Sequence, residues 1–313
     1  MTIHSTQIDD QSVLSQPVMS QPVISQELRH KLKKQRQFKD VLMNVFIWVS
    51  AGLTVGFLFW IMWYILSNGL QYVDWNFITG DYTRTGDEQG IFPMIITTIY
   101  MVIASIAVAA PLGIMTAIYL TEYAKPGSKL VKVIRFCTES LAGIPSIIFG
   151  LFGMTFFVTV MGFGFSLLSG ALTLSILILP VIIRTTEESL MAVAQTYREG
   201  SYGLGASKIY TIWRLILPSA MPGIITAVIL SIGRVIGESA PVFLTAGMVA
   251  RIPESVFDSG RTLTVHLYKL TTELFTIDEW NQAYGTATVL IVLVLIINML
   301  TKLLGSRFNK ANY

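Results

Sequence analysis

Two opposite charges, Arg234 and Glu238, stand four residues apart in the otherwise apolar stretch 223–246. A charged side chain at mid-membrane costs about 2.5–3.5 kcal/mol on insertion scales, so such residues usually face a cavity or a partner and mark the route of an ion or solute. On a helix, this spacing places both side chains on one face. An arginine also suits tetrahedral oxyanions, because its planar guanidinium presents paired N–H donors. The pair indicates either an anion path or a self-neutralising contact that holds helices together.

Arg184 is a weaker candidate for the same path. It lies near the end of the apolar run 166–187, with Glu187 and Glu188 close by as partners. Arginines at the ends of membrane helices commonly extend to the interface, where the charge is solvated. Arg184 therefore fits an ordinary interfacial residue as well as a path residue.

Composition places the chain in a membrane. Of its 313 residues, 53% are hydrophobic and only 13% are charged, about half the charged fraction of a soluble domain. The single cysteine and the three histidines are not spaced as metal ligands, so we expect neither a metal nor another cofactor. The sequence also lacks a G-x-x-x-x-G-K-[ST] phosphate-binding loop. We therefore expect a transport subunit that is not itself an enzyme, with any ATP hydrolysis on another polypeptide.

Six apolar runs are long enough to cross a bilayer, at residues 41–66, 91–121, 140–161, 166–187, 218–246 and 284–304. The second run would measure about 45 Å as a helix, against a hydrocarbon core of about 30 Å. It must therefore tilt strongly or break near Pro111. The third run contains several glycines and Pro145, which indicates an irregular backbone inside a bundle. The expected fold is an all-α integral membrane protein with six transmembrane helices.

The distribution of charges orients these spans. Lysine and arginine are concentrated before the first span, between the second and third, and after the sixth, whereas the loops 67–90 and 247–283 are rich in acids. Because cytoplasmic loops carry the excess of basic residues, both termini are predicted to be cytoplasmic and these two loops external. Residues 1–40 contain a Ser-Gln-Pro-Val repeat and a basic cluster. They predict a disordered basic cytoplasmic tail, followed by a transmembrane domain over 41–310.

The segment 196–217 between the fourth and fifth spans reads as a helix, a glycine turn at 203–205 and a second helix that ends at Pro218. Ile209, Ile212, Trp213 and Ile216 recur at helical spacing and give the second helix an apolar face. A helix of this kind on the cytoplasmic side fits a groove on a partner protein. It also fits an amphipathic helix that lies on lipid headgroups.

This segment resembles the signature loop of permeases in binding-protein-dependent ABC importers, E-A-A, three residues, Gly, nine residues, I-x-L-P. The match falls on Glu199, Gly205, Leu217 and Pro218, with Gly200 and Ser201 in place of the two alanines and Leu215 in place of isoleucine. The resemblance implies that the loop couples the permease to its ATPase, with Glu199 as an anchor or helix N-terminal acid and Gly203, Gly205 and Pro218 shaping the loop.

Further stretches resemble phosphate permeases of the PstA type, over most of residues 40–305. They begin at Pro111, Gly143, Ile183 and Gly233 and include Ile183-Arg-Thr-Thr-Glu and Gly233-Arg-Val-Ile-Gly-Glu-Ser-Ala-Pro. The resemblance implies a bacterial inner-membrane importer of inorganic phosphate. Its other parts would be a PstC-type sister permease that forms a heterodimer with this chain, PstB-type ATPase subunits and an external phosphate-binding protein. It also favours Arg234 and Glu238 as residues of the substrate path, and Arg184 stays the weaker candidate.

Two other functions stay open at this point. A proton-coupled secondary transporter of anions would use Glu238 as its titrating carboxylate. An ABC permease for another oxyanion, molybdate or sulfate, would share every feature above, because selectivity in such systems is set largely by the binding protein.

Overall fold

The computed structural model describes residues 26–82, 90–125, 127–272 and 277–310, and these ranges are helical apart from their connecting loops and an isolated bridge at Tyr82. The chain divides into two units, one ending at Met62 and one running from Trp63 onward. Within the described residues, five helices are long and apolar enough to span a membrane, or six if one bent pair counts as a single span. The expected all-α membrane architecture is confirmed.

The described part of the first unit belongs to the long helix α1 (Gln26–Gly69), whose last turns lie in the second unit; its apolar part gives a candidate span at Lys39–Tyr72. The boundary expected at residue 40 does not coincide with a helix end, because α1 already begins at Gln26. Residues 1–25 of the expected tail lie outside the described residues, so its predicted disorder stays a prediction.

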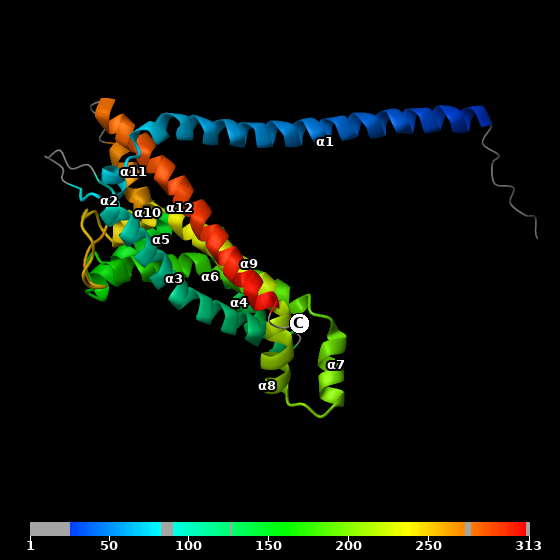
Figure 1. Ribbon diagram of the computed structural model, residues 1–313. Helices are drawn as coiled ribbons and strands as arrows, with labels where there is room; N and C mark the ends of the chain where they lie inside the picture. The colour runs from blue at the N-terminus through cyan, green and yellow to red at the C-terminus, as the bar shows by residue number, and fades with distance from the viewer. Residues whose placement is uncertain (1–25, 83–89, 126, 273–276, 311–313) are drawn as a thin grey trace, which may run out of the picture. The chain divides into compact units, whose positions relative to one another are not determined.

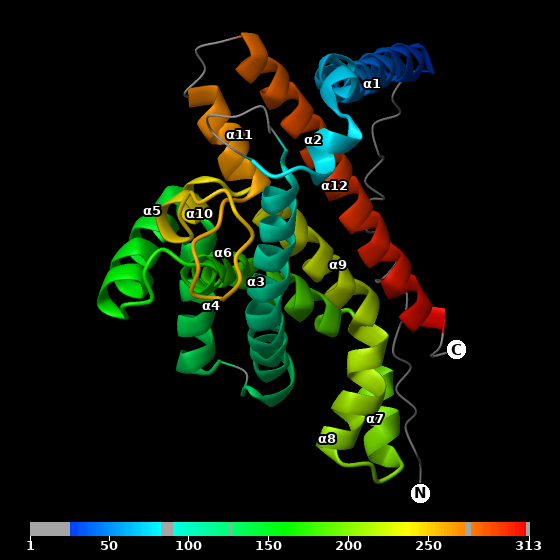
Figure 2. The ribbon, with the colours of Figure 1, turned by 60° about the vertical axis from the view of Figure 1, so that its left-hand side comes forward.

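Three helices form the centre of the second unit: α3 (Phe92–Ile118), α6 (Leu167–Met191) and α9 (Leu217–Gly237). They share one apolar core in which Met101, Leu174 and Ile236 are fully buried. α12 (Ile277–Lys310) packs along α9, as Figures 1 and 2 show. A Cβ at Gly113 of α3 would lie 2.6 Å from Ile182 of α6, so glycine allows these two helices to approach closely.

α3 does not break at Pro111. The helix runs through this proline to Ile118 and continues as the π-helical turn η2 (Tyr119–Tyr123). The alternative of a break is therefore wrong. The candidate span Phe92–Tyr123 is long enough that tilt, or extension beyond the bilayer, must accommodate it.

The third expected span, 140–161, is not one straight helix. α4 (Lys129–Ala142) ends before Pro145, and α5 (Ser146–Gly153) continues into the π-helix η3 (Met154–Val160), with a bend of 105° between the two parts. A proline ring clashes with the carbonyl four residues earlier, here that of Leu141, and it has no N–H to donate. Arg135 and Glu139 consequently belong to a separate, amphipathic helix before the bend.

The fifth expected span, 218–246, is also broken. α9 ends at Gly237, Glu238 is extended with φ −79° and ψ 124°, and the short helix α10 (Ala240–Thr245) follows. In a continuous helix Pro241 would clash with the carbonyl of Gly237, which is where α9 stops. Thr264 of α11 (Leu263–Thr272) donates a hydrogen bond from its hydroxyl to the carbonyl of Ile236 and so satisfies part of the helix end.

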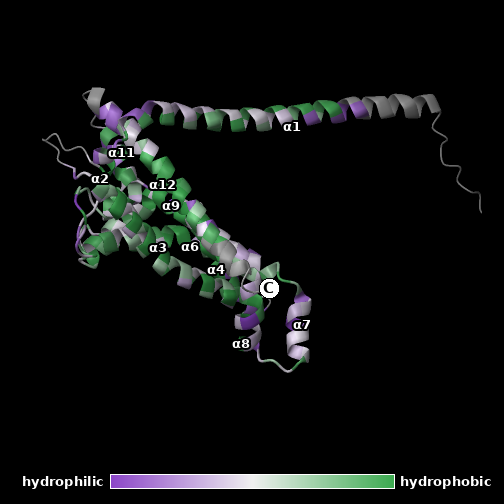
Figure 3. Ribbon diagram, in the orientation of Figure 1, coloured by the Kyte–Doolittle hydropathy of each residue, from purple (hydrophilic) through white to green (hydrophobic). Residues whose placement is uncertain are grey.

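The two ends of the second unit differ in character. α2 (Trp75–Thr79), α10 and α11 lie at one end, and α7 (Gln195–Gly203) and α8 (Lys208–Thr211) lie at the other (Figures 1 and 2). Figure 3 shows that α7 and α8 are mainly hydrophilic, whereas the helices between the two ends are mainly hydrophobic. The bundle therefore carries a polar helical hairpin, α7–α8, at one end.

Candidate functional site: a charged helix break and a polar hairpin

Arg234 occupies the last turn of α9, and Glu238 caps the same helix. Arg234 Nε lies 3.8 Å from Glu238 Oε1, which is an ion pair without hydrogen-bond geometry. The two side chains are 32% and 15% exposed, so the guanidinium keeps access to the outside of the bundle. A cation in the last turn is also favoured by the helix dipole. The sequence correctly paired these residues, but they meet at a helix break and not along a continuous helix.

One stripe of α9 beside Arg234 faces outward. It consists of Thr226, Leu230, Gly233 and Gly237 at alternating three- and four-residue spacing, and these residues are exposed or half-buried. A Cβ added at Gly233 or Gly237 would meet no described atom within 4 Å. No other described helix of the second unit therefore lies close to these glycines, and the stripe is exposed on the surface of that unit.

Arg184 lies at a different level of the bundle from Arg234. On α6 its Nε donates a hydrogen bond of 3.1 Å to Glu188 Oε1, and its side chain is 71% exposed. α6 and α9 touch where Gly223 meets Ser189. From there Arg184 is five residues along α6 and Arg234 eleven residues along α9, so Arg184 lies nearer the hairpin end of its helix. The structure does not bring these two arginines together.

Glu187, which the sequence offered as a second partner of Arg184, instead pairs with Arg135 of α4. The ion pair joins Nη2 of Arg135 to Oε1 of Glu187 and connects α4 with α6. Residues of this cluster line a small cavity of about 220 Å³ together with Arg184 and Glu188. Four of its charges form two ion pairs, Arg135 with Glu187 and Arg184 with Glu188, and Glu139 adds a third carboxylate to the lining.

Gly205 forms the turn of the α7–α8 hairpin. Its φ of +82° lies in the left-handed region that favours glycine. The backbone N–H of Gly205 donates to the carbonyl of Tyr202, and that of Ala206 donates to the carbonyl of Ser201. These two bonds are the Schellman arrangement that ends a helix. The predicted glycine turn is confirmed at Gly205, whereas Gly203 is an ordinary helical residue of α7.

Glu199 and Pro218 differ from expectation in position. Glu199 is the fifth residue of α7, so it is not in the first turn, and it is exposed. The second helix of the hairpin does not end at Pro218, because α8 runs through the π-helix η4 (Ile212–Ile216) directly into α9. Proline is tolerated there at the start of α9, since a π-helical turn precedes it.

The apolar face predicted for the second helix is partly buried against the bundle and partly exposed. Ile212 and Ile216 are buried against residues of α3, α6 and α9. Ile209 and Trp213 are exposed, as is Leu204 at the tip of the hairpin, which is 91% exposed. A groove between the two helices is lined by residues of both, from Thr196 to Leu215. The hairpin is therefore fixed to the bundle on one side and presents apolar side chains on the other.

Two buried features of this end escaped the sequence reasoning. Arg198 of α7 forms an ion pair with Glu122 of η2 at 2.7 Å, and the side chains are only 12% and 6% exposed. Ser201, which stands where the signature loop has its second alanine, shares a buried hydrogen bond of 2.8 Å with Thr211 of α8. The charges of Arg198 and Glu122 within apolar surroundings were the available signal.

A sequence profile of the family described as "Binding-protein-dependent transport system inner membrane component" matches residues 109–311, which is more than half of the chain. The chain belongs to this family of permeases. It is a multi-pass membrane protein, and its resemblance to PstA-type permeases is confirmed by relatives along most of its length.

Two relatives match the permease over most of its length. It is 32% identical over 288 residues to "Probable ABC transporter permease protein YqgI" of Bacillus subtilis, covering 88% of this chain and 98% of that one. It is 34% identical over 280 residues to "Phosphate transport system permease protein PstA 1" of Mycobacterium tuberculosis, covering 86% and 89%.

Solved structures share the fold of this permease. A chain of a bacterial alginate ABC transporter in complex with an alginate-bound periplasmic protein superposes with a TM-score of 0.62 at 15% identity, covering 91% of this chain and 99% of that one. A chain of the MetNI methionine ABC transporter, in an inward-facing conformation, gives a TM-score of 0.52 at 19% identity, covering 72% and 95%. At these identities the likeness concerns the fold alone.

Proposed function

We propose that this permease is the PstA-type subunit of an ATP-driven importer of inorganic phosphate in a bacterial inner membrane. The likeness to PstA 1 over 86% of the chain supports the cargo. The observation that carries the assignment of a path is Arg234, whose accessible guanidinium stands at a helix break beside a stripe that the other described helices of the second unit leave uncovered.

In this proposal phosphate passes between this chain and a PstC-type sister permease, which covers the α9 stripe and forms a heterodimer with it. Arg234 binds the oxyanion through paired N–H donors. Glu238 holds Arg234 when no phosphate is present, or accepts a hydrogen bond from protonated phosphate. Arg184 provides a second cationic position nearer the hairpin.

The α7–α8 hairpin docks on a PstB-type ATPase on the cytoplasmic side. Glu199 and the exposed apolar residues Leu204 and Ile209 supply the contact, and Gly205 shapes the turn. This orientation places both termini in the cytoplasm and the end with α2, α10 and α11 outside, where an external phosphate-binding protein delivers the cargo. Basic residues near the hairpin end, including Lys125 and Lys129, support it.

Reconstitution tests the proposal. Proteoliposomes are prepared with this chain, the sister permease, the ATPase and the loaded binding protein. They should accumulate labelled phosphate only when ATP is present on the side of the membrane that carries the ATPase. Uptake that needs only a proton gradient and no ATPase would establish a secondary transporter instead. Uptake of molybdate or sulfate in preference to phosphate, with their own binding protein, would keep the ABC mechanism and change the cargo.

A further inference from the structure

Arg198 and Glu122 connect the hairpin to two different helices of the bundle. Arg198 Nε and Nη2 both donate to Glu122 Oε1, at 3.1 and 2.7 Å. Nη2 also donates to the carbonyl of Leu190 at 2.9 Å, and Nη1 donates to that of Val193 at 2.8 Å. One guanidinium thus joins α7 to η2, which continues α3, to the last turn of α6 at Leu190 and to the loop after α6 at Val193.

These bonds fix the backbone at the end of α6. The helix ends at Met191, and the carbonyl of Leu190, which also accepts from the N–H of Val193 at 3.4 Å, gains a shorter bond from the charged guanidinium. A lysine at position 198 could not make the same hydrogen bonds, because it offers a point charge and not a planar fork of donors. The side chains of Arg198 and Glu122 are nearly buried, so each charge depends on the other.

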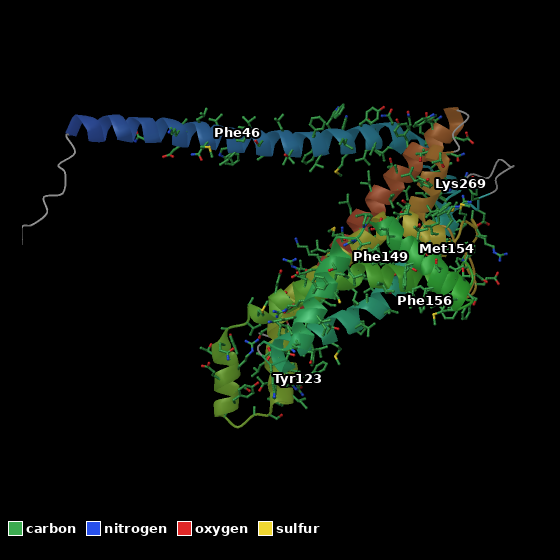
Figure 4. All side chains as sticks on the ribbon, turned by 180° about the vertical axis from the view of Figure 1, so that it is seen from behind. Phe46, Tyr123, Phe149, Met154, Phe156 and Lys269 are labelled. Carbon is green, nitrogen blue, oxygen red and sulfur yellow. The ribbon has the colours of Figure 1, made fainter. Side chains whose placement is uncertain are left out.

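Tyr123, the residue after Glu122, contacts α8, the other helix of the hairpin. Lys208 Nζ of α8 lies 4.8 Å from the ring centroid of Tyr123, within cation–π range. Figure 4 places Tyr123 at the hairpin end of the bundle. The hydrogen bond between Ser201 and Thr211 joins α7 to α8. Both helices of the hairpin are therefore attached to η2 and to each other.

Consecutive residues of α7 face opposite surroundings. Arg198 is directed into the bundle, whereas Glu199 is exposed. A force applied to the exposed side of α7 is therefore transmitted to α3 and α6 through the hydrogen bonds of Arg198, which are short and buried. The other connection, through Ile212 and Ile216, runs along the backbone into α9 and meets α3 and α6 by apolar contacts, which lack the directionality of hydrogen bonds.

We propose that Arg198 and Glu122 are positioning residues for coupling, which make the hairpin move as one body with the end of α3. This rests on the proposed function, in which the hairpin docks on the ATPase. When the pair is lost, the ATPase still binds, since the docking surface is intact, but its movement no longer reaches the helices that bound the path.

The first test uses Arg198→Ala and Arg198→Lys in the complete complex, with Lys129→Ala as a control that removes an exposed cation from the same end. We expect the Arg198→Ala complex to retain its ATPase, while stimulation of hydrolysis by the loaded binding protein and phosphate uptake per ATP fall at least tenfold. Arg198→Lys should recover part of the uptake, and Lys129→Ala should resemble the wild type. Normal uptake per ATP in Arg198→Ala would overturn the proposal.

The second test separates a mechanical connection from a requirement for folding. In a Cys137→Ser background, Arg198→Cys with Glu122→Cys should transport poorly, regain uptake after treatment with a reducible bifunctional thiosulfonate, and lose it again with a reductant. Cross-linking that leaves uptake low in a complex with bound ATPase would overturn the proposal. So would loss of the ATPase from the Arg198→Ala complex, which would make the pair part of hairpin folding. The proposed function fails separately, if hairpin variants such as Glu199→Lys leave ATPase docking unchanged.

Discussion

Pro241 causes α9 to end at Gly237, four residues earlier. It thereby sets the position of Glu238 relative to Arg234. The proline has no N–H to donate to the carbonyl of Gly237 and its ring would clash with it, so the helix stops and Glu238 becomes extended. The ion pair of 3.8 Å consequently spans a helix end. A backbone break of this kind lets a charged side chain reach beyond the surface of a regular helix.

The first prediction concerns the pair itself. Arg234→Ala and Glu238→Ala should each lower phosphate uptake about ten- to a hundredfold, because a hydrogen bond to a charged group contributes about 1.5–3 kcal/mol. The subunit should remain inserted and bound to its ATPase, which co-purification from membranes measures. The double exchange Arg234→Glu with Glu238→Arg preserves a pair but reverses its direction. Full recovery of uptake in that variant would make the pair purely structural.

The second prediction concerns the break. Pro241→Ala restores an N–H and removes the ring, so it should allow α9 to continue toward α10 and draw Glu238 back onto the helix. We expect uptake to fall while the amount of subunit in the membrane is unchanged. Pro222→Ala is the matched control, since α9 already runs through Pro222. Equal uptake in both variants would mean that the break is not needed for transport.

The spans could be predicted from the sequence because hydrophobic length is a local property. The breaks could not be predicted from proline alone. Pro111 and Pro180 lie within continuous helices, whereas the helices stop before Pro145 and Pro241. What differs is the tertiary surroundings: at Pro241 a hydroxyl from α11 reaches the carbonyl of Ile236 and compensates the freed helix end.

The hairpin shows the same division between local and long-range information. The turn at Gly205 follows from a glycine between two helical patterns, and the structure has the positive φ that this requires. The contact of Arg198 with Glu122 joins residues 76 apart in the sequence, and only the packing of α3 beside α6 brings them together. A single sequence shows two charges there and does not show that they meet.

The third prediction is a pH dependence at the end opposite the hairpin. His266 of α11 is buried, and Arg261 Nη1 lies 3.1 Å from its Nδ1, so the ring must be neutral to accept a hydrogen bond there. Burial, followed by the charges of Arg261 and Lys269, lowers the pKa of His266 to about 3. Tyr82 also packs against the ring, with the two ring centroids 5.0 Å apart.

Stability should therefore fall as the pH falls. The unfolded chain takes up a proton near pH 6.5 and the folded chain only near pH 3, so this site removes up to about 1.4 kcal/mol per pH unit between these values and nothing above 6.5. The apparent melting temperature of the purified complex should drop from pH 7 to pH 5. His266→Gln, which cannot take up a proton, should show a smaller drop, and an identical drop would contradict this account.

The last prediction concerns the docking of the hairpin. Gly205→Val puts a β-branched residue at a φ of +82°, which costs about 1–2 kcal/mol and should distort the turn. Glu199→Lys reverses an exposed charge on α7. Both should leave the subunit in the membrane but reduce the ATPase that co-purifies with it, or abolish stimulation of hydrolysis by the loaded binding protein.

Gly200→Ala is the matched control for these variants. It introduces the alanine of the signature loop at a helical position where a Cβ meets no described atom within 4 Å, so ATPase binding should persist. Arg234→Ala should likewise keep the ATPase bound, because it lies on α9 far from the hairpin in sequence. If Gly205→Val and Glu199→Lys both retain the ATPase and its stimulated hydrolysis at wild-type levels, the hairpin does not dock on the ATPase, and its exposed apolar residues contact the lipid surface instead.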